Sequence, residues 1–342
     1  MHLKESIYRD QTIRLAHGNG GRLMRELIEQ VFAKHLKNEL LDINTDAAYL
    51  PFDVALGDIM MTTDGFTVEP LEFPGGNIGS LAVHGTVNDL AVSGAKPLYL
   101  TLNAFIEEGF EISVLDRIVA SLARACVECG VKVVAGDTKI LRRGQGGGVY
   151  LATTGMGQRL TKQIIGLHRI QVGDMLLLSG TAGDHGTAVL LAREQFGLMG
   201  SLKSDAASVL PITEALMEID GLRFMRDPTR GGVATIAHEI SQAVRQSVRL
   251  YEARIPYNQQ TKVVCDLLGY DPLYMACEGR VLAVVAPECA EIAVLKLHAL
   301  GYVDARVVGQ IELGRAHAFI ETELGGERIL QELEDDPLPR IC

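Results

Sequence analysis

Four aspartates in the first half of the chain lie at the ends of apolar segments or in a helical segment bounded by glycines: Asp46 in NTDAAYL, Asp64 in TTDGF, Asp89 in GTVNDLAVSGAKP and Asp137 in AGDTK. Mg²⁺ takes oxygen ligands, and nucleotide sites usually hold it with one or more carboxylates together with phosphate oxygens. A single aspartate after a strand is more often a helix cap or a turn former. Four of them in one half of the chain favour a shared metal site.

Three further segments carry groups that bind anions or accept protons. Lys139 follows Asp137 by two residues, so on a strand both side chains project to one side, an ammonium for phosphate beside a carboxylate for metal. Thr229 and Arg230 stand in RDPTRGGVATIAHEI, where a helix begins and its free N–H groups would bind an anion, although a capped helix with a tight turn has the same pattern. Glu278 in ACEGRVLAVVA opens a strand, where a lone carboxylate is otherwise a solvated end residue.

The usual phosphate-binding motifs do not occur in the sequence. There is no G-x-x-x-x-G-K-[ST], and HGNGGR does not follow a βα crossover as a dinucleotide fingerprint does. The 36 glycines exceed the usual share of ~7%, and many stand beside Asp, Asn or Thr at element junctions. Because glycine lets the backbone approach a ligand closely, this pattern favours a phosphate site built from several loops.

The last residue is a cysteine, Cys342 in EDDPLPRIC. Pro337 and Pro339 favour extended backbone, which predicts a stiffened arm ending in a thiol. A C-a-a-X lipidation signal is excluded because its cysteine stands four residues from the end. Two other cysteines, Cys126 and Cys129, lie in a helical pattern without a second pair nearby, which favours buried apolar cysteines over a zinc site.

Apolar periodicity predicts the elements that position these groups. We expect strands at 58–64, 97–106, 131–136 and 149–155, with helices at 78–93 and 113–129. A second series has strands at 175–180, 281–286 and 306–312, with helices from Asp184, at 233–244 and at 288–300. The alternation predicts two α+β domains joined near 157–172, with arms at both ends of the chain.

Composition limits the class of protein. The 342 residues suffice for two domains, and 47% hydrophobic with 22% charged residues is typical of a soluble globular protein. No apolar run reaches the roughly 18 residues of a membrane span, and no secretory signal opens the chain, so we expect a cytoplasmic protein without a membrane partner. The net charge of -11 argues against nucleic-acid binding.

Several motifs in order, GGNIGSLAVHGTVNDLAVSGAKP, EEGF, AGDTK, GDHG, RDPTRGG and the terminal PRIC, resemble the HypE family, the carbamoyl dehydratases of [NiFe]-hydrogenase maturation, over nearly the whole chain. That family is similar to aminoimidazole ribonucleotide synthetase-like and selenophosphate synthetase-like enzymes. The resemblance implies an α+β fold with two α/β-layered domains of the PurM-like type and extended terminal arms. It divides the chain into a variable arm (1–12), an ATP-binding and dimerisation domain (13–160), a C-terminal domain (170–330) and a flexible tail (331–342).

The resemblance also implies a reaction. In the family, the carbamoyltransferase HypF places a carbamoyl group on the last cysteine, and ATP phosphorylates the oxygen of this thiocarbamate. Loss of phosphate and of the N–H protons leaves S–C≡N, and the cyanide passes to iron on the HypC–HypD complex. The same sulfur must visit a partner and its own ATP site, which a terminal arm of ten extended residues, spanning about 33–36 Å, permits.

Carried onto this chain, the resemblance implies a homodimer paired through the sheets of the first domains, with strands from 58–64 and 97–106. We expect Cys342 to carry the substrate, Glu278 to accept a proton, and Lys139 to stabilise charge or relay a proton beside the docked tail. The residues expected to bind ATP are Asp64, Asn88, Asp89, Gly136, Asp137, Thr138, Thr229 and Arg230, and those expected to bind Mg²⁺ are Asp46, Asp64, Asp89 and Asp137.

Two other functions remain open at this point. One is a different ATP-dependent enzyme of the same fold, making aminoimidazole ribonucleotide or selenophosphate. Such an enzyme acts on a free small molecule and needs no terminal sulfur. The other is a non-catalytic assembly protein that carries ligands for transfer.

The terminal position of Cys342 generates a first prediction. Cys342→Ala should leave nucleotide binding and slow ATP hydrolysis largely intact and abolish cyanide formation, because the sulfur anchors the substrate and lies outside the folded domains. Nucleotide binding by calorimetry and cyanide release by colorimetry measure the two effects. Loss of the folded state in this variant would contradict a tail outside the domains.

Overall fold

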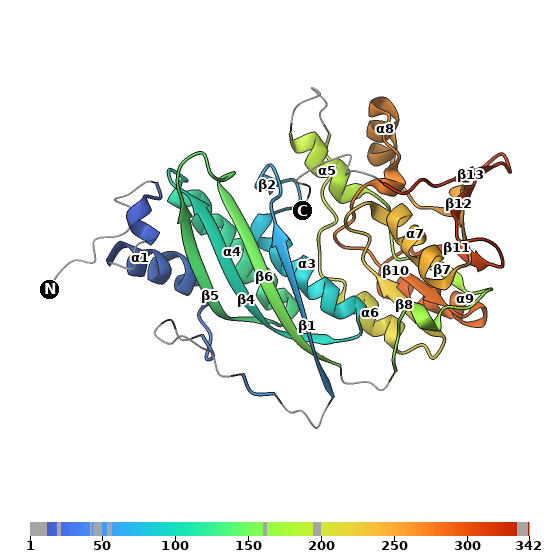
Figure 1. Ribbon diagram of the computed structural model, residues 1–342, viewed down its shortest axis with the longest axis horizontal. Helices are drawn as coiled ribbons and strands as arrows, with labels where there is room; N and C mark the ends of the chain where they lie inside the picture. The colour runs from blue at the N-terminus through green and yellow to red at the C-terminus, as the bar shows by residue number, and fades with distance from the viewer. Residues whose placement is uncertain are drawn as a thin grey trace.

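The computed structural model describes residues 12–18, 22–41, 43, 50–52, 57–159, 163–193, 200–333 and 341. Two expected site residues, Asp46 and Cys342, lie outside the described residues, as does most of the expected N-terminal arm. Figure 1 shows two bodies side by side, each built on its own sheet. Within the described ranges, no helix has both the length and the apolar character that crossing a bilayer requires.

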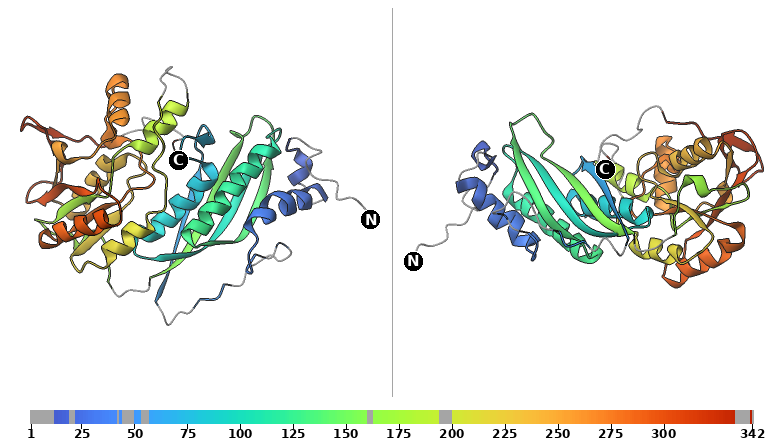
Figure 2. Two further views of the ribbon diagram at one scale, coloured as in Figure 1. Left: turned by 180° about the vertical axis from the view of Figure 1, so that it is seen from behind. Right: turned by 60° about the horizontal axis from the view of Figure 1, so that its bottom comes forward.

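The first body is a four-stranded sheet with helices on one face. The strands run in the order β1 (Asp58–Phe66), β6 (Val149–Arg159), β4 (Lys96–Glu107) and β5 (Lys132–Leu141). β4 and β5 are parallel because α4 (Ile112–Cys129) crosses between them, and the other neighbours are antiparallel. α3 (Ile78–Val92) and α4 cover the rear face, which Figure 2 shows from behind, and no helix or strand among the described residues covers the opposite face.

Smaller elements surround this sheet. η2 (Leu15–Gly18), α1 (Arg22–Leu27), the π-helical η3 (Ile28–Ala33) and α2 (Lys34–Leu36) precede it, and β2 (Glu72–Phe73) pairs with β3 (Gly76–Asn77) before α3. Lys34 and His35 both contact the carboxylate of Asp116 on α4, so the N-terminal helices are joined to the layer that covers the sheet.

Local sequence explains where the two long helices begin and end. The Asn77 side chain accepts hydrogen bonds from the N–H groups of Gly79 and Ser80 and so starts α3, while Ser80 bonds back to Asn77 in a capping box. α4 ends at Gly130, whose φ of 67° is the left-handed conformation that glycine adopts without strain. Both helices confirm the predicted ranges within a residue or so, and Cys126 and Cys129 are buried on α4 as predicted.

The second body is a seven-stranded sheet between two helical layers. Its order is β13 (Glu327–Ile329), β12 (Ala318–Glu321), β9 (Ser247–Tyr251), β11 (Arg306–Glu312), β7 (Met175–Leu178), β10 (Leu282–Val285) and β8 (Leu222–Arg226). α7 (Gly232–Val244) packs with the side chains of one face, and α6 (Leu210–Met217) and α9 (Ala290–Ala299) pack with those of the other.

Two further helices of the second body lie near the first body. α5 (Asp184–Ala192) and α8 (Gln259–Leu268) join it at the top of Figure 1, and short 3-10 turns occur at η4 (Leu167–Arg169), η5 (Glu252–Arg254), η6 (Pro272–Tyr274) and η7 (Pro287–Cys289). The predicted strands at 175–180, 281–286 and 306–312 and the helix at 233–244 are present. β8, β9, β12, β13, α6 and α8 were not predicted, because segments of three to ten residues carry little periodicity.

The two bodies meet along α3. Thirteen of its residues are buried, because the helix lies between its own sheet and the second body. At its centre, the Asn88 side chain donates hydrogen bonds to the carbonyls of Ala207 (3.0 Å) and Glu278 (3.1 Å) and accepts one from the N–H of Val209 (2.9 Å). One amide thus joins the first body to two segments of the second.

This bridge predicts a large effect on stability. Asn88→Ala removes three hydrogen bonds to backbone groups at the junction and leaves the N–H of Val209 without this acceptor, so it should lower the free energy of unfolding by about 2–3 kcal/mol. Gln242→Ala is the matched control, because that exposed amide makes one bond of 3.3 Å to the carbonyl of Ala316. Urea unfolding followed by circular dichroism compares the two. Equal, small effects in both variants would show that the bridge is not important for stability.

Candidate active site

Four carboxyl side chains from different elements gather where the two bodies meet. Asp64 lies on β1, Asp89 near the end of α3, Asp227 directly after β8, and Glu278 shortly before β10. Their negative charges repel one another strongly enough to affect titration. Burial first, and Asp89 second, raise the pKa of Asp227 to about 7. Burial, and to a smaller extent the charge of Asp64, raise the pKa of Asp89.

Two contacts hold this cluster across the junction. The Thr62 hydroxyl on β1 donates to the Asp89 carboxylate at 2.9 Å, which fixes that carboxylate against the sheet. Arg230, from the segment before α7, reaches Asp64 with 3.5 Å between Nη2 and Oδ1. Since the Arg230 side chain is 70% exposed, this ion pair is weak, and the guanidinium remains accessible to an anion.

Glu278 is the most enclosed member of the cluster. It is 2% exposed, and its Oε1 has no hydrogen-bond partner among the described residues. Its backbone is held on both sides, by Asn88 at the carbonyl and by Asp205 Oδ1 at the N–H (3.1 Å). Burial, followed by the charges of Asp227 and Asp205, raises the pKa of Glu278 well above its ordinary value. Such a carboxylate is a stronger proton acceptor than a solvated one.

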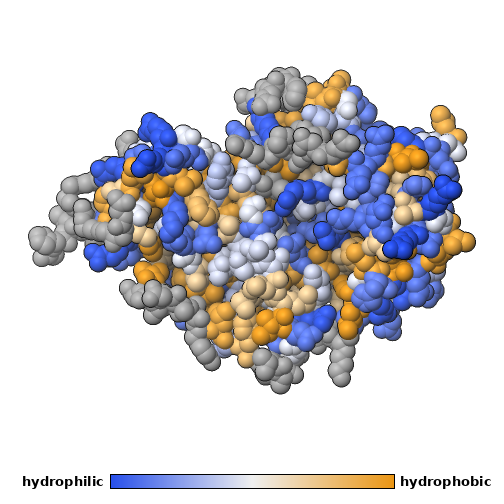
Figure 3. All heavy atoms as spheres, in the orientation of Figure 1, coloured by the Kyte–Doolittle hydropathy of each residue, from blue (hydrophilic) through white to orange (hydrophobic). Residues whose placement is uncertain are grey.

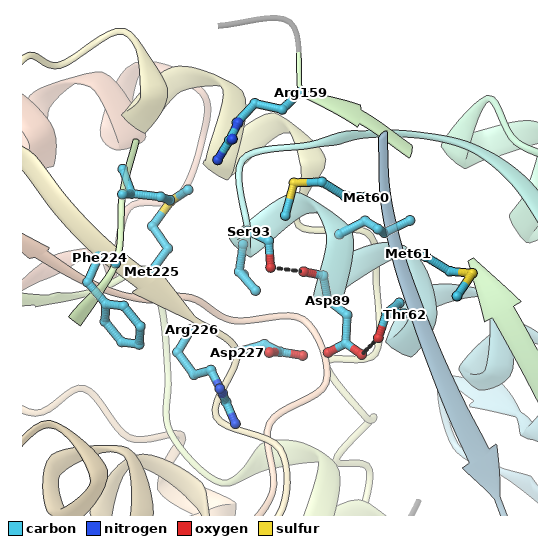
Figure 4. A pocket seen from close by; sticks show the side chains of 14 residues that line it. Met60, Met61, Thr62, Asp89, Ser93, Arg159, Phe224, Met225, Arg226 and Asp227 are labelled. Carbon is cyan, nitrogen blue, oxygen red and sulfur yellow. Dashed lines mark hydrogen bonds between the residues drawn. The ribbon is translucent and has the colours of Figure 1, made fainter. Parts of the chain in front are cut away.

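A cavity of about 480 Å³ adjoins the cluster. Figure 4 shows the carboxylates of Asp89 and Asp227 facing each other at one end of it, with Arg226 beside them. The apolar side chains of Met60, Phe224 and Met225 line part of the rest beside the hydroxyl of Ser93, and Arg159 lies at the far side. A partly apolar cavity with acidic and basic groups at its ends has the size and composition of small-molecule sites.

Asn88 was expected to bind ATP. Its side chain is fully buried, and both amide hydrogens are donated to backbone carbonyls. Its effect on the site is indirect, because it fixes the backbone of Glu278.

Residues 136–139 lie at the opposite edge of the first sheet. Cross-strand register aligns Asp64 on β1 with Thr153, then Leu102, then Gly136 on β5. Three strand spacings amount to about 14 Å, so within one chain Asp137 and Lys139 do not join the cluster. As predicted, these two side chains share a side of the strand, with Lys139 Nζ 2.7 Å from Asp137 Oδ2.

Gly136 and Thr138 have different surroundings from their neighbours. A Cβ at Gly136 would lie 2.5 Å from the carbonyl oxygen of Leu102, so only glycine fits against β4. Thr138 is 7% exposed, whereas Asp137 and Lys139 are exposed. The Thr138 side chain is therefore directed into the protein, on the face opposite to Asp137 and Lys139.

Thr229 and Arg230 stand where they were predicted, at the start of a helix. α7 follows Gly231 and Gly232, whose φ values of 71° and 58° form a tight left-handed entry. A Cβ at Gly232 would lie 2.4 Å from the carbonyl oxygen of Leu273, so the turn packs directly against that backbone. Arg230, just before this turn, contacts Asp64, so the helix start lies beside the carboxylates.

Sequence reasoning missed several groups of the junction. Asp227 stands in the quoted motif RDPTRGG, but an aspartate before proline is also an ordinary turn residue. Thr62 and Asp205 carry no signal of their own in the sequence. His185, in the quoted motif GDHG, is buried at the contact between the two bodies.

The carboxylates of the junction fit a cation that binds together with phosphate oxygens. In the part of the chain that the structure describes, no group of three or more His, Cys, Asp or Glu side chains is already arranged to hold a metal ion. Nevertheless, the half-buried carboxylate of Asp89 and the buried one of Asp227 repel each other, and Oε1 of Glu278 has no partner among the described residues. Mg²⁺ is commonly bound by one or two carboxylates plus substrate phosphates, which is what these residues offer.

Known proteins share both the sequence and the fold of this chain. The model of the AIR synthase related protein N-terminal domain matches residues 44–158, and that of the C-terminal domain matches residues 171–320. The fold is thus the two-domain, PurM-like α+β fold that the sequence predicted. Carbamoyl dehydratase HypE of Bradyrhizobium diazoefficiens is 42% identical over 340 residues, 98% of this chain and 97% of that protein. The chain belongs to the HypE family of carbamoyl dehydratases.

Two solved structures support the same placement. HypE in complex with ATP superposes with a TM-score of 0.91 at 39% identity, covering 96% of this chain and 99% of that one. A HypE–HypF complex matches with a TM-score of 0.78 at 41% identity, covering 90% of this chain and 99% of that one.

The carboxyl cluster predicts a pH-dependent gain from removing one charge. The pKa of Asp227 in the folded chain, about 7, lies above the ordinary 3.8, so its ionised form costs stability above pH 7 and nothing well below pH 4, where folded and unfolded chains are both protonated. Without metal, Asp227→Asn should raise the melting temperature at pH 8 by several degrees and change it little near pH 3.5. The same variant should gain less thermal stability from Mg²⁺ with ATP than the unchanged protein. A lower melting temperature at pH 8 would contradict the repulsion.

Proposed function

We propose that this chain uses ATP to dehydrate a carbamoyl group carried on the sulfur of its own Cys342, and so makes the cyanide ligands of [NiFe]-hydrogenase iron. Membership of the HypE family supports the proposal, as do the relative solved with ATP and the relative solved with HypF. The observation that carries it is the buried carboxyl of Glu278 beside the acidic cluster, whose Oε1 has no hydrogen-bond partner among the described residues.

The chemistry requires a proton acceptor next to a phosphate site. Transfer of the γ-phosphoryl group to the oxygen of S–C(=O)–NH₂ gives a phosphorylated imidate and ADP, with loss of one N–H proton. Loss of phosphate and of the second N–H proton then leaves S–C≡N, so the net change is one water removed from the carbamoyl group. Glu278 is the proposed proton acceptor. Because it is buried, an intermediate bound beside it would be shielded from water that could hydrolyse it.

The other groups of the junction have roles in binding. Asp64, Asp89 and Asp227 would hold Mg²⁺, which when bound neutralises phosphate charge. Arg230 and the start of α7 would bind phosphate oxygens, since both offer N–H donors at the edge of the cluster. The adjoining cavity, which is partly apolar, would take the base and ribose of the nucleotide.

A second copy of the chain is the proposed source of Lys139. The open face of the first sheet exposes Ile59, Met61 and Phe105, and Met61 is 69% exposed. Figure 3, in the orientation of Figure 1, shows pale and orange atoms over this part of the surface. Pairing of two such faces would bury these side chains and bring β5 of one copy toward β1 of the other. HypF and, for cyanide transfer, HypC–HypD are the proposed partners.

Intact mass tests the proposed reaction. After incubation with carbamoyl phosphate, HypF and ATP, we expect Cys342 to gain the mass of one carbamoyl group and then to lose one water. Glu278→Gln should accept the carbamoyl group and bind ATP but lose roughly 10²–10⁴-fold in the rate of water loss, the usual effect of removing a general base. A protein that stops at the first mass is a carrier, and a wild-type rate in Glu278→Gln would exclude Glu278 as the base.

Mixed dimers test the origin of Lys139. Lys139→Ala and Glu278→Gln should each be inactive alone, but a heterodimer of the two, isolated with separate affinity tags, combines an intact Glu278 with an intact Lys139 at one junction. We expect it to recover up to about half of the wild-type activity per dimer, because one of its two sites is intact. Absence of any recovery in a purified heterodimer that binds ATP would place both residues in a single chain.

A further inference from the structure

The motif GDHG has no part in the reaction described so far, although it begins α5 at the contact between the two bodies. Gly183 adopts a φ of 79°, and a Cβ there would lie 2.8 Å from the carbonyl oxygen of Pro272. A Cβ at Gly186 would lie 3.0 Å from the N–H of Ala276. The two glycines therefore let the start of α5 pack directly against the segment that leads to Glu278. His185, between them, has no solvent exposure.

The imidazole of His185 bonds to the end of the chain. Its Nε2 lies 2.8 Å from the carbonyl oxygen of Ile341, and since a carbonyl only accepts, Nε2 carries the hydrogen. Its Nδ1 lies 2.8 Å from the hydroxyl of Ser204, which already accepts from the N–H of Ala206 at 3.0 Å and so has its own hydrogen to donate. Burial lowers the pKa of His185, in keeping with this neutral ring. Each ring nitrogen thus has one partner.

The side chain of Ile341 strengthens the same attachment. It is 3% exposed and belongs to an apolar cluster with Val189, Met275 and Ala276. Phe73 of the first body packs edge-on against the His185 ring, with centroids 5.4 Å apart. The penultimate residue is therefore held by one polar and one apolar contact at the junction of the two bodies.

The residues that orient His185 also hold the proposed base. Ser204 and Ala206 flank Asp205, whose carboxylate accepts the N–H of Glu278 at 3.1 Å. The packing between these segments is tight, because a Cβ at Gly279 would lie 1.9 Å from the carbonyl oxygen of Asp205. A single three-residue segment thus joins the attachment point of the chain end to the backbone of Glu278.

We propose that His185, oriented by Ser204, is a positioning residue that holds the backbone carbonyl of Ile341 and so presents Cys342 to the site. This inference rests on the proposed function, because it concerns the substrate that Cys342 carries. One peptide bond joins Ile341 to Cys342, and consecutive Cα atoms are 3.8 Å apart, so holding the carbonyl of Ile341 confines the sulfur. Recognition through the backbone carbonyl of Ile341 does not use the thiol that carries the group. A contact made of one hydrogen bond and one apolar side chain can also be broken when the sulfur must reach a partner.

Thiol reactivity tests the contact independently of activity. Without HypF or ATP, the rate at which iodoacetamide alkylates Cys342, followed by peptide mapping, reports how often the chain end is released. His185→Phe keeps an aromatic ring and removes the hydrogen bond, so it should raise that rate about three- to tenfold. His185→Gln, which again offers an N–H, should restore much of the protection. His298→Phe is the matched control, because His298 makes the same kind of bond, 2.8 Å to the carbonyl of Ala305, on α9.

The same variants should separate the two stages of the reaction. His185→Phe should accept a carbamoyl group from HypF at least as fast as the unchanged protein and bind ATP equally well, yet lose water about three- to tenfold more slowly in a single turnover. Ile341→Ala, which leaves every residue of α5 unchanged, provides a second variant if His185→Phe fails to fold. It too should raise the alkylation rate.

Three results would overturn the inference. The first is an unchanged alkylation rate of Cys342 in both His185→Phe and Ile341→Ala, and the second is an equal rise of that rate in His298→Phe. The third is a His185→Gln variant that melts like the unchanged protein but does not protect Cys342. Failure of the proposed function gives a different result, because then the unchanged protein itself never loses water. The alkylation rates would still show whether His185 holds the chain end.

Discussion

The site depends on one side chain, the amide of Asn88, which closes the junction between the two bodies. It uses both hydrogens and its oxygen on backbone groups of residues 207–209 and 278, and it precedes Asp89 in α3. Any rotation of one body against the other would break these three bonds inside a buried interface, where unpaired backbone groups are costly. The carboxylates of Asp89 and Glu278 therefore keep their relation to each other, although they come from halves of the chain with separate sheets.

The acidic cluster has a cost that the rest of the fold must offset. Asp89, Asp227 and Glu278 all have raised pKa values, which means that the folded protein holds their charges less well than water does. Such an arrangement lowers stability unless a cation or a phosphate-bound metal is present. Electrostatic destabilisation of this kind is expected at a binding site, because a bound ligand supplies the positive charge that the carboxylates lack.

Periodicity in the sequence predicted the long elements well. α3, α4 and the strands β1 and β4 each repeat their apolar pattern several times, so their ranges agree closely with the structure. Asp64, Asp89 and Glu278 converge, but Asp137 does not join them within one chain, because strand order places β5 at the far edge of the sheet. Strand order is a property of three-dimensional pairing that local patterns do not contain. The backbone contacts of Asn88 were not predicted for a related reason, since an amide that binds a ligand and one that binds backbone look the same in sequence.

The junction also has a consequence for how the protein is made. The bond between Asn88 and Glu278 spans 190 residues of sequence, and the bond between His185 and Ile341 spans 156. At the usual ~5–20 residues per second, a ribosome needs about 10–40 s after Asn88 to synthesise its partner. During that time the outward side of α3, with Ala91 and Val92, has no covering layer. The first body therefore emerges with an apolar helix surface exposed, which makes it a substrate for chaperones until the second body has been synthesised.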